Sequence, residues 1–249
     1  MNAFYDEPSF DYQKYWQGRE YEDTAERIAL KRILKIIGKK EKLLDIGGGY
    51  GRLVSEYIKN FKNCLIIDPS EKLLSQAKKL CYKYKNLSLQ KGIIEKIPQK
   101  NESFDVVLCV RTFHHLENSR QAIKEINRVL KPQGFLILEF ANKIRFKNIL
   151  KAILKLNFKF LVDHNPEKIG KSKIPFYSYH PNQIKTLLLS EGFIILKSLS
   201  VSNFRNPFIK KVIPLKILIQ LESLFSLISS KFSPLMLWGP SIFILAQKK

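Results

Sequence analysis

A glycine-rich segment early in the chain has the residue types and spacing of a nucleotide-binding turn. It reads Asp45-Ile46-Gly47-Gly48-Gly49-Tyr50-Gly51 and continues an apolar run, residues 42–47, that predicts a β-strand. Glycine accepts positive φ and lets a ligand lie against the backbone, and the N–H groups that open the next helix would face that ligand. Position 52 is arginine, which excludes the Gly-x-Gly-x-x-Gly fingerprint of dinucleotide-binding folds. The turn therefore suits a nucleoside with a neutral or zwitterionic tail.

An acidic residue stands at the end of the next predicted strand. Residues 64–68 form a short apolar run that closes with Asp68, 17 residues after Gly51. In nucleotide-binding α/β folds, a carboxylate at this strand tip accepts hydrogen bonds from the ribose hydroxyls. Asp45, the glycine turn and Asp68 together indicate a cofactor site and not only a structural turn.

Short apolar runs alternate with amphipathic segments between residues 41 and 139. The run 104–110 is almost continuously apolar, as in a strand that is buried on both faces. Strands that alternate with helices argue for a parallel sheet covered on both sides, hence an α/β fold. The predicted strands are 42–47, 64–68, 87–90, 104–110 and 135–140; the predicted helices are 51–59, 71–84 and 120–130, with a turn at 131–134.

Two further segments are amphipathic and lie outside this alternation. Residues 143–161 carry a lysine at every fourth position (147, 151, 155, 159) with an apolar face opposite, and residues 215–230 have a similar apolar face. Such helices either cap a pocket with their apolar faces buried or lie in a membrane interface. Around them we predict a polar loop at 163–173, a helix at 181–190 and strands at 193–200 and 242–247.

These motifs resemble those of the class I S-adenosylmethionine-dependent methyltransferases, and within them the UbiE-like, or type 11, branch. The glycine turn is similar to the family's first motif, residues 92–98 to its adenine-side motif, and residues 103–107 and 128–134 to those of its fourth and fifth strands. The resemblance implies a Rossmann-like, seven-stranded, mostly parallel sheet with helices on both faces and an antiparallel last strand. It also implies lid helices in residues 1–40, a methyltransferase domain over 41–249, and substrate-side insertions near 143–162 and 207–237.

The resemblance implies S-adenosyl-L-methionine as the cofactor. Its methionine part would lie along the glycine turn, its ribose on Asp68 and its adenine beside residues 92–98. The family usually has aspartate where this chain has Ile93, so Ile94 or Glu95 would have to receive the adenine amino group. The implied cofactor-binding residues are Asp45, Gly47, Gly48, Gly49, Gly51, Asp68, Ile94, Glu95, Arg111 and Arg19.

An aromatic stretch before the domain resembles the lid that such enzymes fold over the cofactor. It covers residues 15–21 and contains Arg19. Arg19 either pairs with the methionine carboxylate, a charge-assisted contact, or forms a surface ion pair with Glu22 or Asp23.

Methyl transfer from a sulfonium is an in-line displacement, for which the enzyme mainly aligns the reactants and excludes water. Oxygen and carbon nucleophiles also need a base. The family places the loop after the fourth strand at the rim between cofactor and substrate, so His114 and His115 are candidate bases; the alternative is packing or capping of the next helix. Phe113, Tyr177 and Tyr179 are candidates for the substrate pocket, with aromatic packing as the alternative.

The net charge of +21 favours an anionic partner, a nucleic acid or a membrane surface. A lysine-rich composition is the competing explanation, because only nine of the 43 basic residues are arginine, which phosphate and base recognition prefer. From residue 141 onward the chain has 18 basic and 4 acidic residues, so about two thirds of the excess lies on the substrate side. We therefore expect peripheral membrane contact more than nucleic-acid binding.

Three cysteines without paired spacing predict buried thiols and neither a disulfide framework nor a zinc site. The chain has no run of 18 apolar residues and an acidic, aromatic N-terminus, unlike a spanning helix or a signal peptide. We expect a cytoplasmic enzyme that methylates an oxygen or carbon of a small lipophilic acceptor. The alternatives are an RNA or protein methyltransferase and a non-catalytic module that keeps the cofactor fold; the acceptor and the oligomeric state stay open.

Overall fold

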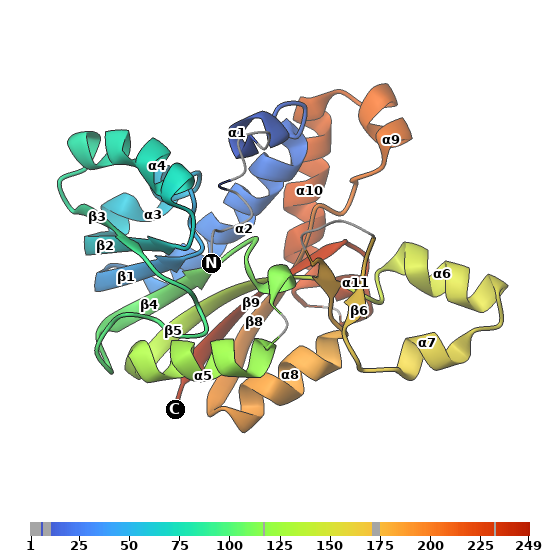
Figure 1. Cartoon of the computed structure of the whole chain (residues 1–249). Coiled ribbons are helices and arrows are strands. Elements are labelled where there is room, and N and C mark those ends of the chain that lie inside the picture. Colours follow the sequence, from blue (N-terminus) through green and yellow to red (C-terminus); the bar gives the residue numbers. More distant parts are fainter. Residues whose placement is uncertain (1–5, 7–10, 117, 171–174, 232) are drawn as a thin grey trace.

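A seven-stranded sheet in the order β3-β2-β1-β4-β5-β9-β8 organises the computed structural model, which describes residues 6, 11–116, 118–170, 175–231 and 233–249 (Figure 1). β1 to β5 run parallel, and β9 is antiparallel to both β5 and β8. The predicted α/β fold is confirmed, including the antiparallel last strand. The strands are β1 (Lys40–Ile46), β2 (Phe61–Asp68), β3 (Leu87–Lys91), β4 (Phe104–Cys109), β5 (Leu130–Ala141), β8 (Phe193–Val201) and β9 (Ser241–Lys248).

Helices cover both faces of this sheet (Figure 1). One face carries α5 (Ser119–Val129) and α8 (Pro181–Ser190); the other carries α2 (Glu20–Ile37), α3 (Val54–Tyr57), the 3-10 turn η2 (Ile58–Asn60), α4 (Glu71–Lys83) and α10 (Leu215–Ser229). Neighbouring residues of a strand enter different cores: Leu44 packs in the α5 core and Leu43 in the α2 core. This alternation explains why strand β4 is apolar from Val106 to Cys109, with all four residues buried.

The predicted turn at 131–134 lies inside strand β5. Phe104 pairs with Leu130 and Val106 with Phe135, so residues 131–134 form an irregularity in the ladder between β4 and β5. Gln133 takes a φ of +61° there. The predicted turn is therefore an irregularity within one strand, and the strand pairs with β4 on both sides of it.

The predicted helix at 143–161 is wrong as a single element. It forms a hairpin of α6 (Phe146–Leu154) and α7 (Phe158–Val162). Leu156 has a φ of +52°, and the side chain of Asn157 accepts a hydrogen bond from the N–H of Phe160 at 3.3 Å. The left-handed residue and the new cap end the first helix and start the second.

The ammonium group of Lys143 holds this hairpin together. The side chain is buried, and its Nζ donates to Oδ2 and the carbonyl oxygen of Asp163 at 2.8 Å each and to the carbonyl oxygen of Asn165 at 2.7 Å. After α7 a short ribbon, β6 (Glu167–Lys168) with β7 (Tyr177–Ser178), forms where a polar loop was predicted; part of that loop, 171–174, lies outside the described residues.

One of the two expectations for the amphipathic helices was that they bury their apolar faces over a pocket. The structure instead leaves most of these apolar side chains exposed. Helix α10 buries Leu218, Glu222, Ser226 and Ser229, whereas Leu221, Leu224 and Ile228 are exposed. Most leucines and isoleucines of α6 are exposed as well, and so are Phe208 and Val212 of α9 (Pro207–Val212). Within the described part of the chain, no helix has the length and apolarity that a bilayer crossing requires.

The three cysteines are free thiols, as the sequence predicts. Cys64 and Cys109 are buried in the two cores, and Cys81 is half-buried on α4. Burial raises the pKa of the Cys64 thiol to about 12, so it stays protonated and inert.

Candidate active site

A cavity of about 220 Å³ lies at the carboxyl ends of β1, β2 and β4. Parallel strands end at one edge of the sheet, and ligands of α/β folds bind at that edge. A wider hollow, lined by Lys42, Asn63 and Ser88 among others, lies at the opposite ends of the strands and contains none of the predicted site residues. The smaller cavity is lined by Tyr12, Ile46, Gly47, Gly49, Asp68, Pro69, Leu73, Gly92, Ile93, Ile94, Glu95, Arg111, Thr112, His115 and Leu116.

The glycine turn needs glycine for its conformation and for the space beside it. Gly47, Gly49 and Gly51 have φ values of +73°, +54° and +80°. A Cβ on Gly47 would lie 2.0 Å from Oγ1 of Thr112. A Cβ on Gly49 would lie 3.3 Å from Leu73 and 3.8 Å from Asp68, both of which line the cavity, so a side chain there would occupy it. The turn forms a cradle that a ligand can fill.

Asp68 is oriented at the cavity by two backbone groups. The N–H of Gly49 donates to its Oδ2 and the N–H of Ser70 to its Oδ1, both at 2.9 Å. Burial raises its pKa to about 6, against the opposing effect of these two hydrogen bonds. Each carboxylate oxygen retains a further lone pair, so Asp68 can also accept from the two ribose hydroxyls.

Asp45 lies beneath the turn and is not among the described residues that line the cavity. A Cβ on Gly48 would be 2.7 Å from the carboxyl carbon of Asp45. The hydroxyl of Tyr57 donates to Oδ2 of Asp45 at 3.0 Å. Burial raises the pKa of Asp45 to about 7. The position of this carboxyl supports the backbone of the turn, and its predicted contact with the methionine part stays a prediction.

The adenine-side residues do lie at the cavity. Ile94 and Glu95 line it together with Ile93, the residue that departs from the family pattern. The amide of Gln121 donates to the carbonyl oxygen of Glu95 at 3.2 Å, which fixes this stretch to helix α5. The cavity therefore joins the glycine turn, Asp68 and residues 92–95 in one site, and their predicted roles toward the ribose and the adenine stay predictions.

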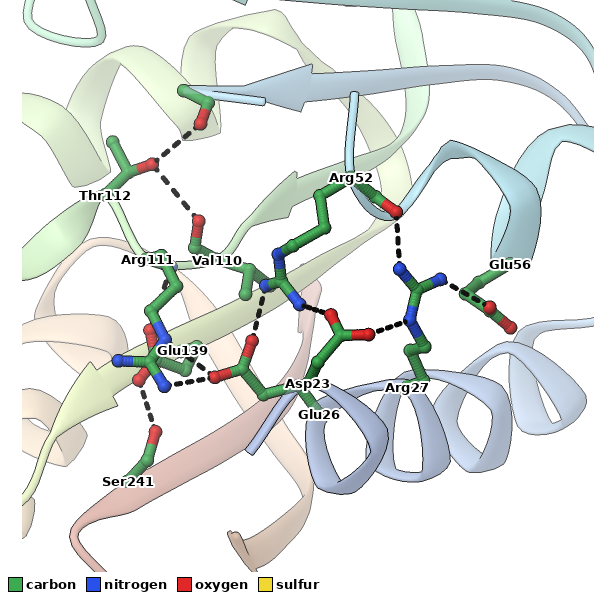
Figure 2. Close-up of polar contacts among 11 residues, drawn as sticks. Asp23, Glu26, Arg27, Arg52, Glu56, Val110, Arg111, Thr112, Glu139 and Ser241 are labelled. Carbon is green, nitrogen blue, oxygen red and sulfur yellow. Dashed lines mark hydrogen bonds and ion pairs between the residues drawn. The ribbon is translucent and has the colours of Figure 1, made fainter. Parts of the chain in front are cut away.

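A buried ion-pair network that was not predicted links helix α2 to the loops at this edge (Figure 2). Glu26 contacts Arg52, and its Oε1 accepts a hydrogen bond from Nε of Arg111 at 2.6 Å. Arg52 also pairs with Asp23 and lies over the ring of Trp16, 3.8 Å from its centroid. Burial alone would raise the pKa of Glu26, but the two guanidinium groups outweigh it and hold the pKa below its usual value.

The same network fixes the backbone after strand β4. Arg111 has a φ of +61°, its N–H donates to Oε2 of Glu139 at 2.9 Å, and Glu139 also contacts Ser241. The hydroxyl of Thr112 donates to the carbonyl oxygen of Gly47 at 3.3 Å. Arg111 lines the cavity as predicted, but its guanidinium is engaged by Glu26.

One pattern in the sequence signals this network. Glu22 and Glu26 fall on the stripe of α2 that also carries Ala25, Ala29 and Ile33, so two acids lie on a buried face and require cationic partners. Glu22 finds Lys210 at 3.0 Å and Arg205 at 3.3 Å.

The N-terminal segment contributes Tyr12 of α1 (Tyr12–Tyr15) to the cavity, a residue that was not predicted. Burial raises the pKa of Tyr12 to about 12. Arg19 lies over the ring of Tyr15, 4.1 Å from its centroid, and pairs with neither Glu22 nor Asp23 in the described structure. The predicted contact of Arg19 with a methionine carboxylate stays a prediction.

The two histidines of the 3-10 turn η3 (Phe113–His115) have different environments. His114 is buried, packs 4.4 Å from the ring of Phe176, and its Nδ1 has no hydrogen-bond partner in the described structure. His115 lines the cavity, and its Nδ1 lies 2.9 Å from the carbonyl oxygen of Pro175. Since a carbonyl only accepts, Nδ1 carries the proton and Nε2 has the lone pair. Burial lowers the pKa of both imidazoles.

The predicted pocket aromatics lie in the core beneath this turn. Phe113 and Tyr179 are fully buried with ring centroids 5.1 Å apart. The hydroxyl of Tyr179 donates to the carbonyl oxygens of Phe113 and Leu116 at 3.2 and 3.0 Å, and Tyr177 packs against the same core. The alternative of aromatic packing therefore describes these residues better, because they support the loop that carries His115.

The comparisons with known proteins agree with this site. Residues 44–138 match a family model described as a methyltransferase domain. The demethylmenaquinone methyltransferase of Chlamydia felis is 31% identical over 160 residues, 63% of this chain and 68% of that protein. This chain belongs to the class I S-adenosylmethionine-dependent methyltransferases, in the type 11 family.

Two more similarities extend beyond the matched domain. An uncharacterised protein of Methanocaldococcus jannaschii is 28% identical to this methyltransferase over 221 residues, 84% of this chain and 82% of that protein. The crystal structure of an S-adenosylmethionine-dependent methyltransferase from Aquifex aeolicus covers 97% of this chain and 100% of its own, with a TM-score of 0.59 at 19% identity, and so shows a shared fold. S-adenosylmethionine is the cofactor of this family, and the glycine cradle and Asp68 fit it.

Proposed function

We propose that this methyltransferase transfers a methyl group to a carbon or oxygen of a small lipophilic acceptor, with His115 as the general base. The observation that carries the proposal is the neutral imidazole at the cavity: its Nδ1–H is held by the carbonyl oxygen of Pro175, so that Nε2 is the basic atom. A carbon or oxygen nucleophile requires such a base, whereas an amine free base does not. His114 has no such role in this proposal, because it is buried against Phe176.

The lining of the cavity supports an uncharged acceptor. Of its charged residues, Asp68 is assigned to the ribose, Glu95 belongs to the stretch assigned to the adenine, and the guanidinium of Arg111 is engaged by Glu26. Thr112 and Leu116, on either side of the 3-10 turn that carries His115, also line the cavity and are uncharged. The relatives named demethylmenaquinone methyltransferases suggest the acceptor class, an aromatic ring that bears hydroxyl groups and an apolar substituent.

The chemistry follows from these positions. S-adenosylmethionine supplies, when bound, a methyl group activated by its sulfonium. Nε2 of His115 would accept the proton of a ring hydroxyl as the acceptor takes the methyl group, and the neutral thioether of the cofactor would be the leaving group. For a carbon acceptor the ring hydrogen is then lost and the hydroxyl restored, so that one proton is released in either case.

The test supplies the purified protein with methyl-labelled S-adenosylmethionine and a hydroquinone, a phenol or an amine of similar shape. We expect label in the hydroquinone or phenol and about a 100-fold or larger fall in kcat for His115→Gln, with cofactor affinity retained. His164→Gln, at an exposed histidine, is the matched control and keeps full activity. Because burial lowers the pKa of His115, the acid limb of kcat/KM should lie below the ordinary histidine value and disappear in the variant.

The same labelled cofactor with a cell extract distinguishes the alternatives. Lipid and small-molecule fractions should receive the label. Label in the RNA or protein fraction, with activity unaffected by His115→Gln, contradicts the proposed acceptor class and base.

A further inference from the structure

We propose that helices α6, α7, α9 and α10, with α11 (Ser233–Met236) and Trp238, form a docking surface for an anionic lipid bilayer. Docking on this surface would turn the edge of the sheet that carries the cofactor cavity toward the lipid. The proposal goes beyond the assigned enzyme class. It rests on the proposed function in one respect only, namely that the enzyme would find a lipophilic acceptor in the membrane.

Large apolar side chains are exposed on these helices. Leu154 and Leu156, at the end of α6, are 76% and 77% exposed, and Val162 of α7 and Phe208 of α9 are each 73% exposed. Neighbouring aromatic rings connect the apolar residues of α6 with those of α10. The rings of Phe146 and Trp238 are stacked with centroids 4.5 Å apart, and those of Trp238 and Phe225 are tilted with centroids 5.7 Å apart. Exposed apolar patches of this kind mark interaction surfaces.

The conformation of Leu156 argues that this exposure is not incidental. A bulky residue at a φ of +52° is strained, and a turn of this type ordinarily uses glycine or asparagine. The strained position nevertheless presents an exposed leucine at the tip of the hairpin, whose shape Lys143 fixes. Strain of this kind concentrates at functional positions.

Helix α10 is oriented by its polar side. The carboxylate of Glu222 is buried and accepts hydrogen bonds from the hydroxyl of Tyr21 at 2.5 Å and from the N–H groups of Ser202 and Asn203 at 2.9 Å each. These bonds fix which face of the helix is inside. Leu221, Leu224 and Ile228 therefore face outward because of specific contacts, not because of a loose helix.

Positive charge lies among these apolar residues. Residues 143–162 contain six basic residues and no acid, and the lysines at 147, 151, 155 and 159 are exposed. Lys151 and Lys155 also line a cavity of about 280 Å³ between α6 and α7, together with Asn148, Asn157, Phe160, Ala152 and Glu167. At a bilayer interface, the lysines would contact the anionic headgroups and the exposed leucines beside them would enter the acyl region.

The topology sets the orientation. Helix α6 follows the carboxyl end of β5, and α9 follows that of β8, which runs parallel to β5 because both are antiparallel to β9. Both helices therefore leave the sheet at the edge where β1, β2 and β4 end and the cofactor cavity lies. Figure 1 shows α6, α7 and α9 on the side away from β1–β3.

A bilayer accounts for both features of the surface better than a second copy of the chain. Two copies that buried the same leucines would bring their rows of lysines together, a like-charge repulsion. An anionic membrane accepts the leucines and neutralises the lysines at once.

The test is co-sedimentation of the full-length protein with vesicles of phosphatidylcholine alone or mixed with phosphatidylglycerol. We expect binding to the mixed vesicles that weakens with salt. Replacing lysines 147, 151, 155 and 159 by glutamine should weaken it by about 100-fold. The matched control replaces the exposed lysines 59, 78, 83 and 85 with the same change in charge and should weaken it far less.

A second variant separates the surface from the fold. Leu156→Asn should relieve the strained φ, keep or raise the midpoint of thermal unfolding, and still reduce vesicle binding. Failure to bind the mixed vesicles, equal losses in the two lysine variants, or dimer formation without binding overturns the proposal. Binding is measured without a methyl acceptor, so it fails or succeeds independently of the proposed reaction.

Discussion

The half of the molecule built on β1–β4 and the half that carries helices α6, α7, α9 and α10 distribute apolar and polar side chains in opposite ways. Around the cofactor cavity, leucines and valines are inside, and the charged groups that are buried with them, such as Glu26 and Arg52, are paired. On α10 the buried face carries Glu222, Ser226 and Ser229, and the leucines are largely outside. The first arrangement is that of a self-sufficient core; the second leaves apolar surface for something else to cover. Each difference leads to a measurable consequence.

Glu26→Ala should have the largest effect on the cofactor half. It removes the carboxylate that pairs with Arg111 and leaves Arg52 with Asp23 alone, so it should lower the free energy of unfolding by about 3–5 kcal/mol. Because the folded-state pKa of Glu26 is below its ordinary value of 4.5, its stabilisation is complete above that value and lost as pH falls through the folded pKa. Urea unfolding at neutral and acid pH measures this. Glu71→Ala, at an exposed pair with Lys91, is the control and should cost at most about 1 kcal/mol.

Two leucines of α10 test the reversed polarity directly. Leu218 is buried, so Leu218→Ala should cost about 2–5 kcal/mol. Leu224 is exposed on the same helix, so Leu224→Ala should change stability by no more than about 0.5 kcal/mol. Equal losses in urea unfolding of the two variants would show that Leu224 is buried in solution and would remove the contrast between the two halves.

Asp68→Asn should lower the affinity for S-adenosylmethionine, measured by calorimetry, by about 10- to 100-fold, because a hydrogen bond to a charged group is worth about 1.5–3 kcal/mol. Asp105→Asn, in strand β4 beside Lys131 and far from the cavity, is the control and should bind normally. An unchanged affinity in Asp68→Asn contradicts the assignment of this carboxylate to the ribose.

Asp45→Asn should have the smallest effect and the opposite sign. The pKa of Asp45 rises from 3.8 to about 7 on folding, so its carboxyl is favoured in the folded state at low pH, and this advantage is lost as pH rises through about 7. Asparagine can still accept from Tyr57, so we expect a gain of about 1–2 kcal/mol at pH 8 that vanishes below pH 4. Thermal unfolding at the two pH values checks it; destabilisation at pH 8 would mean that the charge itself supports the turn.

The sequence alone determined the cofactor half to a large extent. Short apolar runs located β1, β2 and β4, and amphipathic segments located α4 and α5, because the burial of each element is determined by its own residues. The glycine turn and Asp68 were predicted for the same local reason. The residue types themselves indicate the conformation of the turn and the position of the acid at a strand end. The cavity brings them together as expected.

The tertiary structure decided what depends on residues far apart in the chain. Glu26, Arg52 and Arg111 are partners across three segments, and which of His114 and His115 reaches the cavity depends on Pro175 and Phe176. The amphipathic period showed that α10 has two faces, but not which of them is buried. Hydrogen bonds to Glu222 determine which face of α10 is buried. One of them comes from Tyr21, 201 residues away in the chain, and the periodic pattern of a helix carries no information about so distant a partner.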